Sequence, residues 1–265
     1  MRLCMMSCQM PGYSPAEIAD AAVYCGMDAI DFIGMHDTDA HTLRKAADDA
    51  GIRIAAHTML KEKFLYDEPD FMDEFKASLD AACIMNAPIM MLPPFPRKTG
   101  GYSMAEDRKA WIDYYAQACP LAKAAGIQLT VESTGYDRSP ITTGDEVLEV
   151  LRQVPDLRVT FDHGNTATAD DPIAAYHKLA PYIVHFHLKD WKIYPTPQQN
   201  TTLKRDGRYY ADALIGTGDM DLKLFWQNVS AEHKQLYVNL ETLDYSGKLN
   251  HREALKLVSD NLRNW

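Results

Sequence analysis

Four side chains that can bind a divalent metal ion each end a short, mainly apolar segment in the second half of the sequence. They are Glu132, Asp162, His187 and Glu241. Three carboxylates gathered at one point without a cation would repel one another and raise at least one carboxyl pKa. A divalent ion removes this repulsion, and oxygen ligands with one imidazole suit Mn²⁺, Mg²⁺, Co²⁺ or Fe²⁺ better than a thiolate-rich zinc site does. We therefore expect these four residues to bind one metal ion.

The pattern of the chain supplies elements that can bring these residues together. Short apolar runs alternate with longer segments of helical periodicity, which is typical of repeated strand–helix units. Strands are expected at 2–7, 29–33, 53–57, 89–92, 127–132, 158–162, 183–188 and 236–241. Helices are expected at 14–26, 39–50, 69–85, 105–125, 144–153, 172–179, 221–230 and 252–263, with a long connection at 189–218. This alternation predicts an α/β fold, a single (β/α)₈ TIM barrel.

A closed barrel is favoured over an open parallel sheet for two reasons. The chain has 265 residues, close to the roughly 250 that are typical of this barrel. An open sheet usually has a glycine-rich phosphate turn after its first strand, and Gln9-Met10-Pro11-Gly12 is not one. The active site of such a barrel lies at the carboxyl ends of its strands. The four candidate ligands close strands five to eight, and we expect the whole chain, 1–265, to form one domain.

Composition narrows the class of partner. The formal net charge of −10 argues against a nucleic-acid binder, because neutralising phosphates needs clustered Lys and Arg. Five cysteines, an odd number without a CxxC pair, indicate reduced thiols. No segment has the roughly 18 uninterrupted apolar residues of a membrane span, and the amino-terminal apolar run is too short for a signal peptide. We expect a cytoplasmic protein that acts on a small molecule, without membrane or nucleic-acid partners.

Several motifs resemble those of one enzyme superfamily. They are Phe161-Asp162-His163-Gly164-Asn165, His185-Phe186-His187-Leu188-Lys189-Asp190, Gly216-Thr217-Gly218-Asp219-Met220-Asp221 and Asn239-Leu240-Glu241. In this order they resemble the sugar phosphate isomerase/epimerase superfamily, the xylose-isomerase-like barrels. That superfamily includes ketose 3-epimerases, hydroxypyruvate isomerases, inosose dehydratases and apurinic endonucleases. The motifs are specific for the superfamily and much less so for any one member.

The resemblance implies a reaction and a set of roles. Glu132, Asp162, His187 and Glu241 would bind one divalent ion, with Mn²⁺ the first choice and Mg²⁺, Co²⁺, Fe²⁺ or Zn²⁺ as alternatives. Glu132 and Glu241 would also act as the acid/base pair that removes and returns a proton next to a carbonyl of a sugar or sugar phosphate. The enediolate formed in this way needs a Lewis acid. The simplest alternative is that the two Glu residues only bind the metal. A homo-oligomer is compatible with the resemblance.

Four further residues are candidates for contact with a sugar or polyol substrate. His57 ends the third strand, where the family often has a histidine in the site, and Asn165 stands where many members have a substrate-binding histidine. Lys189 lies beyond the strand end on the side of His187 and can reach an oxyanion or phosphate. Trp191 follows in a mouth loop and can stack on a sugar face. Packing, turn formation or a solvated ion pair with Asp190 explains the same residues without a functional role.

Other activities need different residues. An apurinic endonuclease would need a histidine at the fourth strand end, where Met91-Leu92-Pro93-Pro94 stands, and one at position 165, which is Asn. A nuclease is therefore disfavoured. An inosose-type dehydratase would use the same metal ligands, so the sequence does not separate elimination from epimerisation. A non-catalytic sugar-binding barrel is a third alternative, although all four candidate ligands are present.

Overall fold

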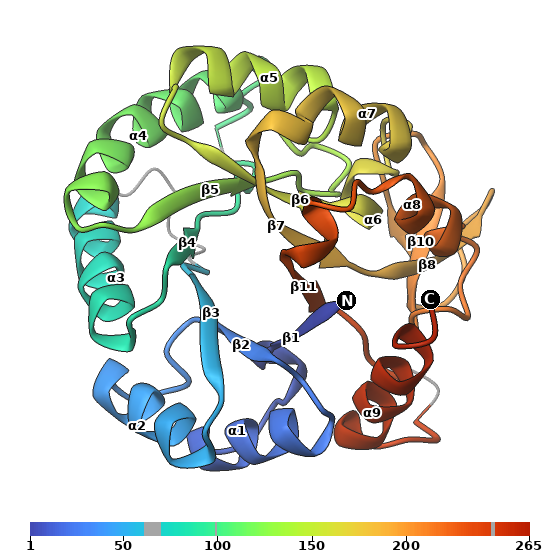
Figure 1. Cartoon of the computed structure of the whole chain (residues 1–265). Coiled ribbons are helices and arrows are strands. Elements are labelled where there is room, and N and C mark those ends of the chain that lie inside the picture. The colour runs from blue at the N-terminus through green and yellow to red at the C-terminus, as the bar shows by residue number, and fades with distance from the viewer. Residues whose placement is uncertain (61–69, 99, 245–246) are drawn as a thin grey trace.

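Eight parallel strands close into a barrel in the computed structural model, which describes residues 1–60, 70–98, 100–244 and 247–265. The barrel strands are β1 (Arg2–Met6), β2 (Ala29–Ile33), β3 (Arg53–Thr58), β4 (Ile89–Met91), β5 (Gln128–Glu132), β6 (Arg158–Asp162), β7 (Ile183–Leu188) and β11 (Tyr237–Leu240). The barrel closes because β1 pairs with β2 on one side and with β11 on the other. The predicted (β/α)₈ fold is confirmed (Figure 1).

Helices form the outer ring around these strands (Figure 1). They are α1 (Pro15–Tyr24), α2 (Ala40–Ala50), α3 (Phe71–Met85), α4 (Met104–Ala124), α5 (Gly144–Gln153), α7 (Pro172–Leu179), α8 (Leu222–Asn228) and α9 (His251–Leu262). Capping boxes begin α1, α4, α5 and α9, so side chains satisfy amide groups that have no partner inside the helix. These elements match the expected ranges to within two residues, and the expected helix start at Pro69 lies outside the described residues.

The core lies mainly between the strands and the helices. Buried side chains such as Phe75, Tyr115, Phe161 and Phe186 fill this layer. A separate small cluster of Cys4, Ala29 and Ala55 packs against Tyr237. No helix among the described residues is both long enough and apolar enough to cross a membrane.

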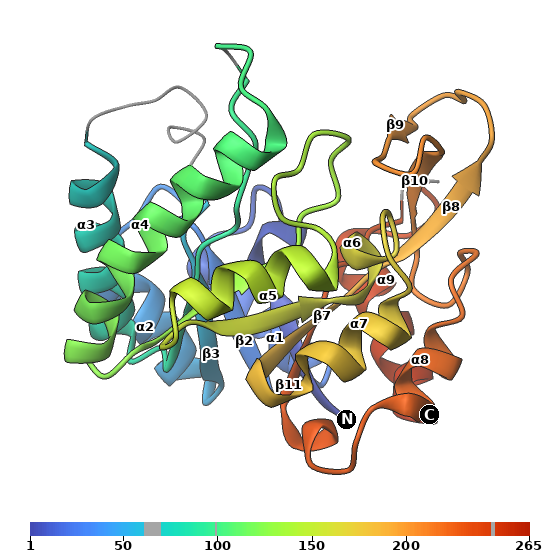
Figure 2. The ribbon, with the colours of Figure 1, turned by 90° about the horizontal axis from the view of Figure 1, so that it is seen from above.

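The long connection expected at 189–218 contains a second sheet, which the sequence pattern did not predict. The strands β8 (Asp190–Tyr194), β9 (Thr202–Leu203) and β10 (Tyr209–Ala213) pair antiparallel in the order β8-β10-β9. A short helix, α6 (His163–Thr166), was also not expected. Figure 2 shows that this appended sheet continues from the carboxyl end of β7 and projects on the side where the loops after β4 and β5 also project. The appended sheet therefore stands beside the mouth of the barrel.

Candidate metal centre

A cavity of about 370 Å³ lies at the carboxyl ends of the barrel strands. Its lining includes Glu132, Asn165, His187, Lys189, Trp191 and Glu241, together with side chains from the loops and from the appended sheet. This is the size range of clefts that bind small molecules. Most of the candidate residues therefore meet in one place, as expected from their positions at strand ends.

Three of the four candidate ligands form a close group. One ligand atom from each of Glu132, Asp162 and His187 lies within 4.8 Å of the others, and all three residues are buried. His187 Nδ1 is 2.7 Å from Glu132 Oε1. Within the described part of the chain, neither of these two atoms has a partner with hydrogen-bond geometry. The two groups therefore form a close ion pair with poor hydrogen-bond geometry, and a divalent cation between them would satisfy both buried atoms.

Glu241, the fourth candidate ligand, lies next to this group. It follows β11, and its Oε2 is 2.5 Å from Lys189 Nζ. The same ammonium group is 3.0 Å from Asp162 Oδ2. Lys189 therefore lies between the carboxylates of Asp162 and Glu241. Its positive charge lies where a metal ion shared by these two carboxylates was expected. Glu241 faces the cavity with 28% of its side chain exposed, so it is accessible to a substrate.

Burial and neighbouring charges shift the pKa of each of the three close candidate ligands. Burial raises the pKa of Asp162 to about 7, although Lys189 opposes the rise. Burial would also raise the pKa of Glu132, but contacts with His187, Lys189 and Asp162 together outweigh burial, and this pKa lies below its ordinary value. Burial would lower the pKa of His187, yet Glu132 and Asp31 raise it to about 10. Protonated His187 and Lys189 thus offset the negative charge of the carboxylates. A metal ion would compete with the proton on His187.

Asp31, which the sequence analysis missed, supports His187 from deeper in the barrel. Its fully buried carboxylate has Oδ2 3.7 Å from His187 Nε2 and accepts hydrogen bonds from Asn239 Nδ2 and Thr58 Oγ1. Asp31, His185 and His187 form a second group of close potential ligand atoms. Since Nδ1 of His187 faces Glu132, the contact at Nε2 fixes the ring orientation. A carboxylate inside the apolar run Ala29–Ile33 was the signal for this role.

Asn165 holds Asp162 in place. Its backbone N donates to Asp162 Oδ1 at 2.7 Å, and its Nδ2 donates to Asp162 Oδ2 at 3.0 Å and to Ser133 O at 2.9 Å. Its Oδ1 accepts from Lys189 Nζ at 3.2 Å. Asn165 also lines the cavity, so the same residue orients a candidate ligand and faces the space in which a substrate would lie.

The geometry corrects the expectation that His57 faces the substrate. Its Nδ1 lies 2.9 Å from Phe32 O and its Nε2 2.9 Å from Ser78 Oγ on α3. The pairing register of β2 and β3 shifts by one residue near Ala55, so Thr58 faces the cavity and His57 points outward. An extra residue in a strand reverses the side-chain alternation that follows it.

Lys189 and Trp191 face the cavity, whereas Asp190 turns away from it. Trp191 is buried and donates from Nε1 to Gly164 O at 3.0 Å. The Asp190 carboxylate accepts from the backbone N of Gly216 at 2.9 Å and of Gly218 at 2.8 Å. A Cβ added at Gly218 would lie 2.0 Å from Asp190 Oδ1. The two glycines therefore form a turn around Asp190, and Lys189 pairs with Asp162 and Glu241 rather than with Asp190.

The two remaining histidines near the site are packed residues. His163 packs against Phe225 with tilted rings whose centroids lie 4.6 Å apart, and burial lowers its pKa to about 3. His185 lies 5.5 Å from His187 between ring centroids and is buried. His163 follows Asp162 directly and points away from the group of close ligand atoms, toward Phe225.

Solved structures with the same fold include several enzymes. The chain is similar to 3-keto-D-glucoside 4-epimerase, YcjR, from E. coli, with 15% identity, 100% of both chains covered and a TM-score of 0.76. It is also similar to the IOLI protein with a binding zinc atom, with 15% identity, 100% of this chain and 97% of that chain covered and a TM-score of 0.78. The probable 3-DHS dehydratase AsbF, involved in petrobactin synthesis, from Bacillus anthracis has 17% identity, with 100% of this chain and 99% of that chain covered and a TM-score of 0.74.

No curated protein matches the sequence significantly. The family model of the xylose isomerase-like TIM barrel matches residues 19–263, which is most of the chain. The match, the closed barrel and the group of potential metal ligands agree with one another. The chain therefore belongs to the xylose isomerase-like TIM barrel family.

Proposed function

We propose that the protein is a divalent-metal-dependent isomerase or epimerase of a sugar or sugar derivative. The observation that carries this proposal is the buried pair of Glu132 and His187, whose facing atoms lie 2.7 Å apart without hydrogen-bond geometry. A second carboxylate, Glu241, faces the same cavity. A metal ion that polarises a carbonyl, beside two carboxylates that can accept and return a proton, would support proton transfer at the neighbouring carbon.

Glu132, Asp162 and His187 would hold the ion. Glu241 would become the fourth ligand if the Lys189 ammonium group moved away from Asp162 and Glu241. Mn²⁺ is our first choice, with Mg²⁺, Co²⁺, Fe²⁺ and Zn²⁺ as alternatives, because the donors are oxygens and one imidazole. The ion would supply Lewis-acid polarisation of the substrate oxygens. Glu132 and Glu241 would then remove a proton from one face of the reacting carbon and return it to the other.

Hydrogen exchange tests this proposal directly. The protein loaded with Mn²⁺ is incubated in D₂O with ketoses, sugar phosphates and inososes, and deuterium at carbon is measured by mass spectrometry. We expect incorporation into at least one compound and a loss of about 10²- to 10⁴-fold in the Glu241→Gln variant. Glu232→Gln changes an exposed carboxylate and serves as the matched control. Exchange at the wild-type rate in Glu241→Gln would show that Glu241 is not the base.

A dehydratase is the second candidate, and Lys189 is the observation that favours it. Its ammonium group lies 2.5 Å from Glu241 Oε2, where it can donate a proton to a leaving hydroxyl group. Elimination begins with the same proton abstraction and ends with loss of water. The two activities separate in the exchange experiment, since a dehydratase yields a product lighter by one water.

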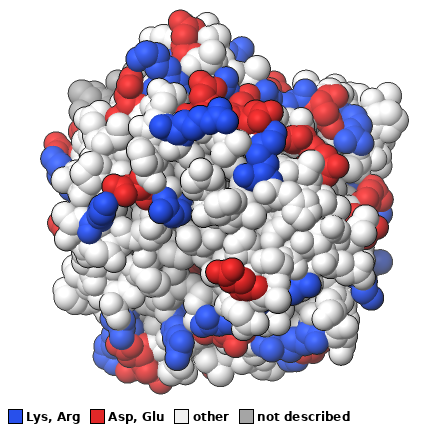
Figure 3. Space-filling view, turned by 45° about the horizontal axis from the view of Figure 1, so that its top comes forward, with Lys and Arg blue, Asp and Glu red and all other residues white. Residues whose placement is uncertain are grey.

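A small-molecule substrate is favoured over nucleic acid, and catalysis over binding alone. On the face in Figure 3, Lys and Arg are interspersed with Asp and Glu rather than gathered into one basic tract. Binding to a phosphate backbone needs such a tract. Metal analysis of the purified protein separates an enzyme from a sugar-binding barrel without activity. Protein that contains no metal and does not bind added Mn²⁺ would support the barrel without catalysis.

A further inference from the structure

A second lysine, Lys204, faces the cavity from the appended sheet. It follows β9, is 7% exposed, and lines the cavity together with Trp191 and Tyr136. Its Nζ is 4.8 Å from the ring centroid of Trp191 and 5.4 Å from that of Tyr136. Lys189 Nζ lies 5.5 Å from the centroid of the same Trp191 ring. Two ammonium groups thus lie near one indole at the mouth of the barrel.

Lys204 differs from Lys189 in having no anionic partner. Among the described residues, no carboxylate lies within ion-pair distance of its Nζ, whereas Lys189 contacts Asp162 and Glu241. Buried charges in proteins are normally paired, because removing them from water is costly. Burial and the nearby charge of Lys189 lower the pKa of Lys204 to about 8. Within the described part of the chain, Asp212, Glu241 and Asp162 act on this cation only from beyond ion-pair distance and offset the effect of burial in part.

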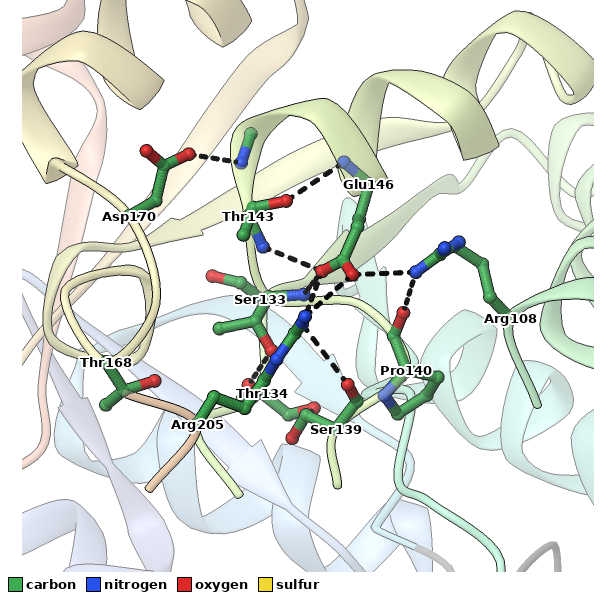
Figure 4. Close-up of polar contacts among 12 residues, drawn as sticks. Arg108, Ser133, Thr134, Ser139, Pro140, Thr143, Glu146, Thr168, Asp170 and Arg205 are labelled. Carbon is green, nitrogen blue, oxygen red and sulfur yellow. Dashed lines mark hydrogen bonds and ion pairs between the residues drawn. The ribbon is translucent and has the colours of Figure 1, made fainter. Parts of the chain in front are cut away.

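The segment that carries Lys204 is fixed to the barrel. Arg205 Nη1 is 2.6 Å from Glu146 Oε2, and Arg205 Nη2 is 3.0 Å from Glu146 Oε1. Arg108 Nη1 binds the same carboxylate at 2.8 Å, as Figure 4 shows. The backbone N of Asp206 donates to Thr168 O at 3.0 Å. A bidentate ion pair that is largely buried limits motion, so Lys204 is held over the cavity rather than free in solvent.

We infer that Lys204, Trp191 and Tyr136 form a subsite for an anionic group of the substrate, a phosphate or a carboxylate. This inference rests on the proposed function for the position of the reacting carbons, which would lie between Glu132 and Glu241. The anion would supply the missing partner of Lys204, while the two rings cover it from water and strengthen the charge–charge contact. Lys204 would then be a specificity residue that selects acidic sugars over neutral ones.

Amine labelling tests the subsite without metal or turnover. Acetic anhydride at limiting concentration acetylates lysines, and mass spectrometry gives the rate at each position. We expect inorganic phosphate or acetate, compared with chloride at equal ionic strength, to slow labelling of Lys204 at least threefold. Lys192 of the same sheet pairs with Asp219 and should be unaffected. Labelling of Lys204 at the same rate in all three salts would overturn the inference, whatever the outcome of the exchange experiment.

Matched ligands then identify the anion. Binding of fructose, fructose 6-phosphate and fructuronate to the Mn²⁺-loaded protein is measured by calorimetry. We expect at least tenfold tighter binding of one anionic compound than of fructose, and its identity separates phosphate from carboxylate. Lys204→Met should remove this preference, and Lys192→Met should keep it. Equal binding of all three compounds, or a preference that survives in Lys204→Met, would overturn the inference. If none of the three binds, the labelling result alone decides it.

Discussion

Lys189 and Lys204 face the same cavity from elements of different kinds. Lys189 follows a barrel strand and contacts two carboxylates, and Lys204 belongs to the appended sheet and contacts aromatic rings. The first lysine compensates charges that the protein itself has gathered. The second is a charge without an ion-pair partner among the residues that the structure describes. The comparison suggests that the strand ends carry the chemistry and the appended sheet selects the substrate.

Removing Lys189 should destabilise the protein more than any other change at the two lysines. Lys189→Met leaves Asp162 and Glu241 near each other without the ammonium group between them. Breaking a buried ion pair on one side costs about 3–5 kcal/mol, so the metal-free variant should unfold at a clearly lower urea concentration. Added Mn²⁺ should restore much of the loss, since the ion replaces the missing charge. Stability equal to that of the wild-type protein without metal would contradict the role given to Lys189.

Removing Lys204 should stabilise the protein, whereas removing Lys189 should destabilise it. Its pKa is lowered from 10.5 to about 8, so the native state disfavours the charge that the unfolded chain carries. Lys204→Met should therefore raise the free energy of unfolding by about 1–3 kcal/mol below pH 8. The gain should shrink between pH 8 and 10.5, because native wild-type protein loses the proton there while the unfolded chain keeps it. Urea unfolding at pH 7 and pH 10 checks both parts, with Lys192→Met as the control. A loss of stability at pH 7 would count against an unpaired charge.

The affinity for an anionic ligand should depend on pH through the protonation of Lys204. If Lys204 binds the anion, affinity for the preferred anionic ketohexose should be constant below pH 8. It should fall by about tenfold per unit above that value, as the free protein loses the charge. Fructose should show no such fall, and Lys204→Arg should move the fall to higher pH. Calorimetry of both ligands between pH 7 and 9.5 makes the measurement. A parallel fall for fructose would assign the effect to another group.

The sequence predicted the barrel and the close grouping of three candidate ligands well, because both depend on local pattern. Strand ends at Glu132, Asp162 and His187 follow from apolar runs and helix caps, and parallel strands in a barrel bring their ends together. His57 was placed in the cavity because the one-residue register shift near Ala55 leaves no local mark in the sequence. Asp31 was overlooked since its role depends on residues from β7 and β11.

The appended sheet and Lys204 could not be predicted for a related reason. Its strands are short, and the segment between β8 and β9 contains Pro195 and Pro197, which are typical of loops. The role inferred for Lys204 depends on its contacts with Trp191 and Tyr136, which lie on different segments of the chain. Tertiary contacts of this kind decide the function of a polar residue, and periodicity does not record them.

Glu146 connects the start of a helix with the position of the appended sheet. Its carboxylate begins α5 through a capping box with Thr143, and it also fixes Arg205 of the appended sheet. A substitution there would weaken a helix and release the segment that carries Lys204 at the same time. One substitution at this largely buried position would therefore affect folding and, on the role inferred for Lys204, substrate choice as well. If the appended sheet were grafted onto a related barrel to change its substrate, Glu146 and Arg108 would have to be introduced into that barrel as well.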